Sequence, residues 1–82
     1  MADLEKTLYD LCLPLVDDAS TLSVKQMASA DDNEILLYVY AASEDVARLI
    51  GRKGLMASSL RQMMSIAARD TRKHVSVKFE AY

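Results

Sequence analysis

The only two glycines of the 82-residue chain are Gly51 and Gly54, and the two positions between them are Arg52 and Lys53. Because glycine has no side chain, the backbone can turn sharply there and a ligand can approach it closely. The residues on both sides follow helical patterns, so we expect exposed N–H groups at the start of the second helix. Backbone donors beside positive charge favour a phosphate group. The segment predicts a phosphate-contacting turn, although a G-x-x-G alone is also compatible with an ordinary turn between helices.

Groups that could perform catalysis are scarce. The chain has one histidine, His74, and one cysteine, Cys12. The adjacent acids fall at a predicted loop, a turn and a helix start, where acids have structural roles; they are Asp17-Asp18, Asp31-Asp32 and Glu44-Asp45. The G-x-x-x-x-G-K-[ST] loop of nucleotide-binding proteins is absent. We therefore expect no enzyme, no metal site and no cofactor.

The charge of the chain is unevenly distributed along the sequence. The net charge is −2, but residues 48–73 contain seven cations against one acid, Asp70, a net +6, and the remainder has a net −8. The seven cations are Arg48, Arg52, Lys53, Arg61, Arg69, Arg72 and Lys73. Such asymmetry indicates a surface that binds a polyanion, while the alternative is a basic helix face exposed to solvent.

The first half of the chain predicts one helix and two strands. Residues 3–16 have an apolar stripe at helical spacing, and Pro14 should end the helix near Leu13. Residues 22–27 alternate like a strand with one face in solvent, and residues 34–41 predict a strand that is apolar on both faces and therefore central. Tyr38 and Tyr40 on this strand could stack with bases, be half-buried strand residues, or form a dimer contact.

The second half predicts two helices around the glycine turn and a last strand. Ser43 is the expected N-cap of a helix that ends at Gly51. A longer helix should run from Leu55 to Asp70, and residues 74–82 alternate as a half-buried strand. The expected apolar face of the longer helix consists of Met56, Leu60, Met63, Met64 and Ala67.

These elements predict one domain with an α+β fold. The strands 34–41 and 74–82 are separated by two helices and should be parallel, whereas the first two strands should be antiparallel. The result is a mixed three-stranded sheet with three helices on one face. Neither a membrane-spanning run nor a signal peptide is expected, and the single cysteine favours a reducing, cytoplasmic environment.

Further sequence marks accompany the glycine turn. They are Pro14-Leu15-Val16-Asp17, the helix start Ser43-Glu44-Asp45-Val46, the segment Leu49 to Gly54, Met56-Ala57 and Leu60-Arg61. On these residues the chain resembles type II KH domains, with the order α-β-β-α-(GxxG)-α-β. More closely, it resembles the small bacterial single-domain KH proteins of the KhpA type over essentially all of residues 1–82. Residues 1–32 would be the N-terminal helix and strand extension, and residues 33–82 the core KH unit.

The resemblance implies binding of single-stranded RNA without catalysis, in bacterial RNA metabolism or post-transcriptional regulation. The implied contact residues are Ile50, Gly51, Arg52, Lys53, Gly54, Arg61, Arg72 and Lys73. Ile50 would be an apolar wall for the bases, and the last three would add contacts if they face the same groove. Leu55 and Ser58 stand where the family often has basic residues, which removes up to two phosphate contacts.

The resemblance also implies protein partners. Family members can pair with themselves or with a larger protein that contains a KH domain. The alternative function is therefore a protein–protein adaptor or dimerisation module that retains the KH fold. The net acidity and the residues Leu55 and Ser58 favour the adaptor, whereas the cations between the glycines favour RNA.

Overall fold

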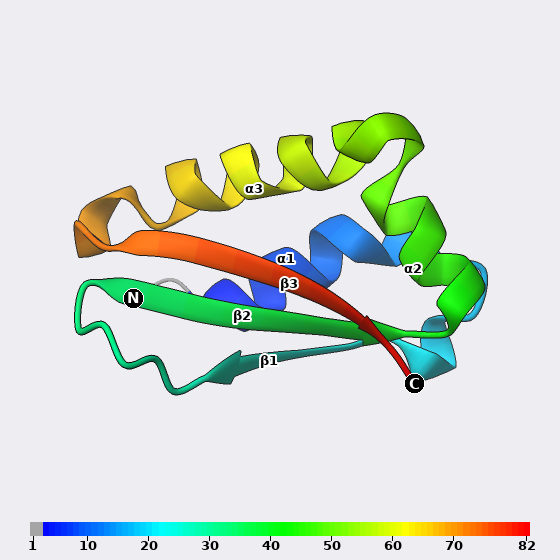
Figure 1. Ribbon diagram of the computed structural model, residues 1–82, viewed down its shortest axis with the longest axis horizontal. Coiled ribbons are helices and arrows are strands. Elements are labelled where there is room, and N and C mark those ends of the chain that lie inside the picture. Colours follow the sequence, from blue (N-terminus) through cyan, green and yellow to red (C-terminus); the bar gives the residue numbers. More distant parts are fainter. Residues whose placement is uncertain (1–2) are drawn as a thin grey trace.

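The computed structural model describes residues 3–82 and has the predicted order of helices and strands (Figure 1). The elements are α1 (Leu4–Cys12), β1 (Ser23–Met27), β2 (Glu34–Ala41), α2 (Ser43–Ile50), α3 (Leu55–Ala67) and β3 (His74–Ala81). Short 3₁₀ turns lie at Leu13–Leu15, Ala19–Thr21, Arg52–Gly54 and Arg69–Thr71. The α+β fold class predicted from the sequence is confirmed.

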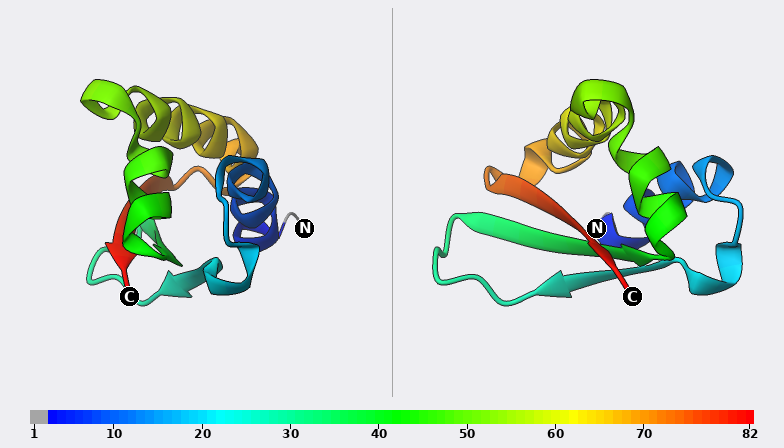
Figure 2. Two further views of the ribbon diagram at one scale, coloured as in Figure 1. Left: turned by 90° about the vertical axis from the view of Figure 1, so that its right-hand side faces the viewer. Right: turned by 45° about the vertical axis from the view of Figure 1, so that its right-hand side comes forward.

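The sheet has the strand order β1-β2-β3, with β1 antiparallel and β3 parallel to β2. The predicted central position of β2 and both pairing directions are therefore correct. The three helices lie on one side of this sheet (Figure 2). As a consequence β3 is an edge strand, and α3 runs above it.

The core lies between the sheet and the helices. Alternate residues of β2 point into it, and Leu37 and Val39 are completely buried. Leu8, Leu49 and Met64 are equally inaccessible on the three helices. This alternation explains why β2 is apolar on both faces: one face meets the helices, and the other is the half-buried outer face of the sheet.

Two details of the predicted helices were wrong. Ala42 is the N-cap of α2, and Ser43 is instead its first helical residue, without a capping side-chain bond. Met63 was predicted to be in the core but is 47% exposed, because α3 buries Ala57, Leu60 and Met64, and Ala68 is buried directly after it. The buried stripe is thus rotated from the predicted one, since α3 packs against both α1 and α2 as well as β3.

The longer helix also ends earlier than predicted. Helix α3 stops at Ala67, and the Thr71 hydroxyl donates to the Ala68 carbonyl at 2.6 Å in the following 3₁₀ turn. Arg72 then adopts a left-handed conformation (φ 59°, ψ 19°). This reversal brings the His74 N–H to the Asn33 carbonyl at 2.8 Å, where the parallel pairing of β3 begins.

Candidate nucleic-acid interface

Gly51 has a backbone conformation that residues with a side chain rarely adopt. Its φ of 77° and ψ of 174° lie in a region that is essentially restricted to glycine. A Cβ at this position would lie 2.7 Å from the Met56 Cβ and 3.0 Å from the Met56 N atom. Gly51 therefore allows α2 and α3 to follow each other with only one short turn between them.

Gly54 differs from Gly51 because the space beside it is open. It is left-handed (φ 76°, ψ 13°) and is the N-cap of α3, to which it contributes no side-chain hydrogen bond. Its N–H closes the turn on the Gly51 carbonyl at 3.1 Å. A Cβ at this position would meet no heavy atom within 4 Å. An anion can therefore approach the backbone at the start of α3 closely.

The cations at the tip of the turn are available for a ligand. Arg52 and Lys53 are exposed, and neither belongs to an ion pair within residues 3–82. Arg48 is different: it bonds Asp45 at 2.7 Å and Asp17 at 3.0 Å. One of the seven cations of the basic segment is thus neutralised within the fold, whereas the two at the tip are not.

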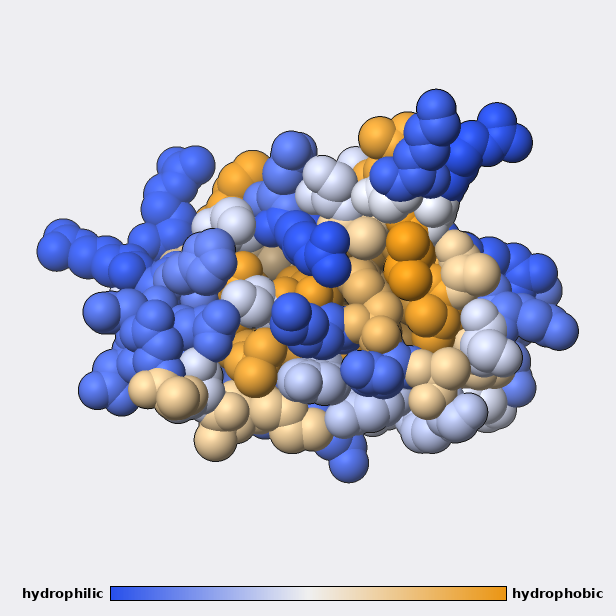
Figure 3. Space-filling model, viewed as in Figure 1, coloured by the Kyte–Doolittle hydropathy of each residue, from blue (hydrophilic) through white to orange (hydrophobic). Residues whose placement is uncertain are grey.

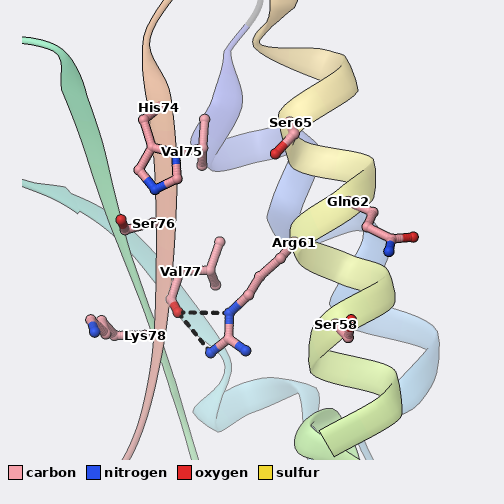
Figure 4. Close-up of a pocket in the computed structure, with 9 residues that line it drawn as sticks. All are labelled: Ser58, Arg61, Gln62, Ser65, His74, Val75, Ser76, Val77 and Lys78. Atoms are coloured by element: carbon pink, nitrogen blue, oxygen red, sulfur yellow. Dashed lines mark hydrogen bonds between the residues drawn. The ribbon is translucent and has the colours of Figure 1, made fainter.

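A groove of about 400 Å³ lies between α3 and the edge strand β3 (Figure 4). It is lined by Ser58, Arg61, Gln62, Ser65, His74, Val75, Ser76, Val77 and Lys78. Figure 3 shows hydrophilic side chains projecting at both ends of α3 and apolar surface in the hollow between them. Apart from Val75 and Val77 the lining is polar and includes Arg61 and Lys78, so the groove offers hydrogen-bond donors to bases, while the exposed cations at its ends suit phosphates.

Arg61 crosses this groove from α3 to β3. Its Nε and one terminal nitrogen donate to the Val77 carbonyl at 3.3 and 3.1 Å, and its guanidinium lies 5.6 Å from the centroid of the Phe79 ring. Figure 4 shows the side chain reaching the strand. Arg61 therefore faces the groove, as the hypothesis of an added contact requires, and it is hydrogen-bonded to the edge of the sheet.

Arg72 and Lys73 lie at the other end of α3 from the glycine turn. The 13 residues of α3 separate the two ends by about 20 Å, at a rise of about 1.5 Å per residue. Both side chains are exposed, and the next residue, His74, lines the groove. The predicted contact residues thus form three groups: the turn with Ile50 before α3, Arg61 in the groove, and the Arg72-Lys73 pair after α3.

The sequence did not reveal the role of Asp45, which was interpreted only as an acid at a helix start. Its side chain is 2% exposed and accepts hydrogen bonds from the N–H groups of Asp17 and Asp18 at 2.9 and 3.1 Å. These two bonds, followed by the Arg48 guanidinium, hold the pKa of Asp45 below its ordinary value. Asp45 ties the loop after α1 to the helix that leads into the glycine turn.

Four other positions named from the sequence have clear places in the structure. Leu55, the first residue of α3, is 66% exposed beside the turn, and Ser58 lines the groove one turn later. Tyr38 and Tyr40 are on the outer face of the sheet, away from α3. A base in the groove therefore could not stack on these tyrosines.

Within residues 3–82, no cluster of three or more His, Cys, Asp and Glu side chains is arranged to hold a metal ion. No helix in this part of the chain is both long and apolar enough to cross a membrane.

The chain begins with a helix and a strand, and a strand–helix–G-x-x-G–helix–strand unit follows on the same mixed sheet. This arrangement defines a type II KH domain. The chain belongs to the KhpA/KhpB family of KH domains. The family model described as "KhpA/KhpB, KH domain" matches residues 5–79. No curated protein sequence gives a significant match.

Proposed function

We propose that this chain binds single-stranded RNA without catalysis. The G-x-x-G turn contacts the phosphates, and the bases lie in the groove between α3 and β3. The observation that supports this best is the turn itself, where open backbone at Gly54 lies beside two cations that have no acidic partner in the described residues. A KH turn of this kind contacts about four nucleotides.

The other predicted residues have consistent roles in this proposal. Ile50 provides an apolar wall next to the turn, and Arg61 offers donors to a base inside the groove. Arg72 and Lys73 contact phosphates at the far end of α3. The proposal needs no nucleophile, and the only cysteine is unsuited to be one, because burial raises the pKa of the Cys12 thiol to about 11.

The proposed cellular role is in bacterial RNA metabolism or post-transcriptional regulation in the cytoplasm. One groove that holds about four nucleotides reads too few bases to specify a transcript alone. A homodimer, or a complex with a larger KH-containing RNA-binding protein, would add the missing specificity.

A second candidate function is that of a protein–protein adaptor. The observation that favours it is the outer face of α3, where Leu55 and Ile66 are 66% and 63% exposed and Met63 lies on the same side. Exposed apolar side chains that gather on one helix face are typical of protein contacts. RNA binding and pairing through this face are compatible, because the groove is on another side of α3.

The test of the proposed function is a fluorescence-anisotropy titration of a randomised short single-stranded RNA at low and moderate salt. The Arg52→Asp/Lys53→Asp variant should lose binding, whereas Lys6→Asp, which reverses a charge on α1, should retain most of it. Circular dichroism establishes that each variant is folded. Absence of binding by the folded wild-type protein would favour the adaptor, and equal loss in both variants would exclude a specific role of the turn.

A further inference from the structure

The outer face of the sheet has a row of three tyrosines. The ring centroids of Tyr38 and Tyr40 are 6.0 Å apart, and those of Tyr40 and Tyr82 are 5.9 Å apart. Neighbouring ring planes are inclined by only 24° and 29°. Tyr82 is tied to this row through its N–H, which donates to the Ala41 carbonyl at 3.2 Å. Tyr38 and Tyr40 alternate along β2 with the buried residues that face the helices, so the row lies on the opposite face, and Tyr82 is largely exposed.

Two cations flank one end of the tyrosine row. In the register of the sheet, Lys25 pairs with Tyr38 on one side and Lys78 pairs with it on the other. Both lysines are exposed, and neither belongs to an ion pair within residues 3–82. The row therefore has an aromatic residue between two lysines, a combination that suits single-stranded nucleic acids. Of the two, Lys78 also interacts electrostatically with the Glu34 carboxylate.

Acidic side chains on the same face lie away from this end or are already hydrogen-bonded. Glu80 pairs with Tyr40, next to the middle ring of the row. Glu34 is at the start of β2 and accepts hydrogen bonds from the hydroxyls of Ser29 and Ser76. These hydrogen bonds, first from Ser29 and then from Ser76, lower the pKa of Glu34, so it stays negatively charged and partly offsets Lys78. With Lys25 and Lys78 against this one acid, the end of the row at Tyr38 is its positive end.

The positive end of the row is continuous with the groove. Ser76 and Lys78 line the groove, yet they alternate along β3 with Val75 and Val77, which point into the core. They therefore belong to the outer face at the edge of the sheet. Because β3 is the edge strand and pairs directly with β2, the width of a single strand separates the groove from Tyr38.

We propose that the tyrosine row is a second contact surface for the same single-stranded RNA, an inference that rests on the proposed binding in the groove. Nucleotides that leave the groove pass Lys78 at the edge of β3. Because the three rings already stack on one another, bases stack on the faces left free at the two ends of the row, on Tyr38 and Tyr82. Lys25 and Lys78 contact the phosphates of this segment. Stacking of this kind tolerates any base, because every base has a π face. The row therefore lengthens the site without adding sequence specificity.

The first experiment compares two ten-nucleotide RNAs with the wild-type protein. One has all its bases, and the other lacks the bases outside the central four positions but keeps the same phosphates. The readout is intrinsic fluorescence, since the chain has no tryptophan and three of its four tyrosines are in the row. We expect the complete RNA to quench this fluorescence strongly and to bind roughly five-fold or more tightly than the partly abasic RNA.

The second experiment uses variants that keep the strand apolar but remove the aromatic faces. Tyr38→Leu should weaken binding of the complete RNA by roughly five-fold or more and leave the partly abasic RNA unaffected. Tyr40→Leu removes the ring that supports the other two. It should also weaken binding of the complete RNA alone. Tyr9→Leu, which removes a tyrosine from α1, is the matched control and should bind like the wild type. Lys25→Gln should weaken binding of both RNAs, because both have phosphates there, whereas Lys6→Gln should not.

Each failure has a distinct meaning. Equal affinity for both RNAs without quenching would overturn the tyrosine row as an RNA surface. If the Arg52→Asp/Lys53→Asp variant still lost binding in that case, the proposed function of the turn would stand. If neither RNA binds, both proposals fail. If the tyrosine variants leave RNA binding unchanged but alter the mass in sedimentation equilibrium, the row is a protein contact and the inference is wrong.

Discussion

At the scale of single residues, the two glycines of the turn have different roles, although the sequence presents them as equivalent. Gly51 is needed for its backbone conformation and for the absence of a Cβ near Met56. Gly54 is needed for the open space beside it. The first role concerns the path of the chain between α2 and α3, and the second concerns access of a ligand.

This difference predicts different outcomes for Gly51→Asn and Gly54→Asn. Asparagine tolerates the left-handed conformation of Gly54, so Gly54→Asn should lower the free energy of unfolding by less than about 1 kcal/mol. Gly51→Asn should lower it by more, because asparagine does not tolerate φ 77°, ψ 174° and its Cβ would overlap Met56. Urea unfolding followed by circular dichroism measures both values. An equal decrease in the free energy of unfolding of both variants would show that the turn adjusts to a side chain at either position.

A second residue-scale prediction concerns the positions that lack the basic side chains often found in the family. Ser58→Lys places a cation on the wall of the groove and should strengthen RNA binding, with a salt dependence steeper by about 0.7 in log–log slope. Ser59→Lys is the matched control, since Ser59 is also exposed on α3 but does not line the groove. Equal gains in both variants would indicate nonspecific attraction.

At the scale of elements, the turn is held in place by the helix that precedes it. Helix α2 carries Asp45, whose carboxylate binds the backbone after α1 and the side chain of Arg48. The loop after α1 and helix α2 are thus joined at one buried carboxylate. Asp45 and Arg48 therefore have a structural role. Because they are paired with each other, Arg48 is not a free cation for a ligand.

This arrangement predicts how stability depends on pH. The pKa of Asp45 is lowered in the folded state, chiefly by the N–H groups of Asp17 and Asp18, so its stabilising effect is complete above its ordinary pKa of 3.8. The effect is lost as the pH falls from there through the lowered value, because the unfolded chain then binds the proton first. The free energy of unfolding, from urea titrations between pH 7 and pH 2.5, should therefore decline in the acid range.

The variant Asp45→Asn isolates this contribution. It should be less stable than the wild type at pH 7, since an amide oxygen cannot replace both carboxylate oxygens. Its stability should also depend less on pH in the acid range. Some dependence should remain, because hydrogen bonds from Ser29 and Ser76 also lower the pKa of Glu34. An unchanged acid dependence would mean that Asp45 does not control it.

At the scale of the whole molecule, a protein with a net charge of −2 presents exposed cations at both ends of α3, Arg52 and Lys53 before it and Arg72 and Lys73 after it. Binding to a polyanion should therefore depend on local charge and be sensitive to salt. Arg52→Gln and Lys53→Gln should each reduce the log–log salt slope by about 0.7, the value for one phosphate contact in a single strand. Lys6→Gln, which removes an equal charge on α1, should leave the slope unchanged. Unchanged slopes in both loop variants would exclude Arg52 and Lys53 from the contact surface.

Much of the fold could be predicted because its signals are local. A short apolar run over residues 34–41, alternation over residues 74–82 and helical spacing over residues 43–50 identify the elements. The two intervening helices determine that β2 and β3 are parallel. The error in the predicted core concerns which side of α3 is buried, and tertiary packing determines this. Met63 satisfies the helical spacing as well as Ala68 does, but only contact with α1, α2 and β3 determines which of them is buried.

The sequence by itself determined the element order, the glycine turn with its cations and, through these, the family. The tertiary structure decided which charges are free: Arg48 is neutralised by Asp17 and Asp45, whereas Arg52 and Lys53 are not. It also placed Lys25 and Lys78 on either side of Tyr38, on three neighbouring strands. The physical reason is that hydrogen-bond and ion-pair partners are selected by proximity in space, and residues far apart in the chain become neighbours only when the sheet and helices pack.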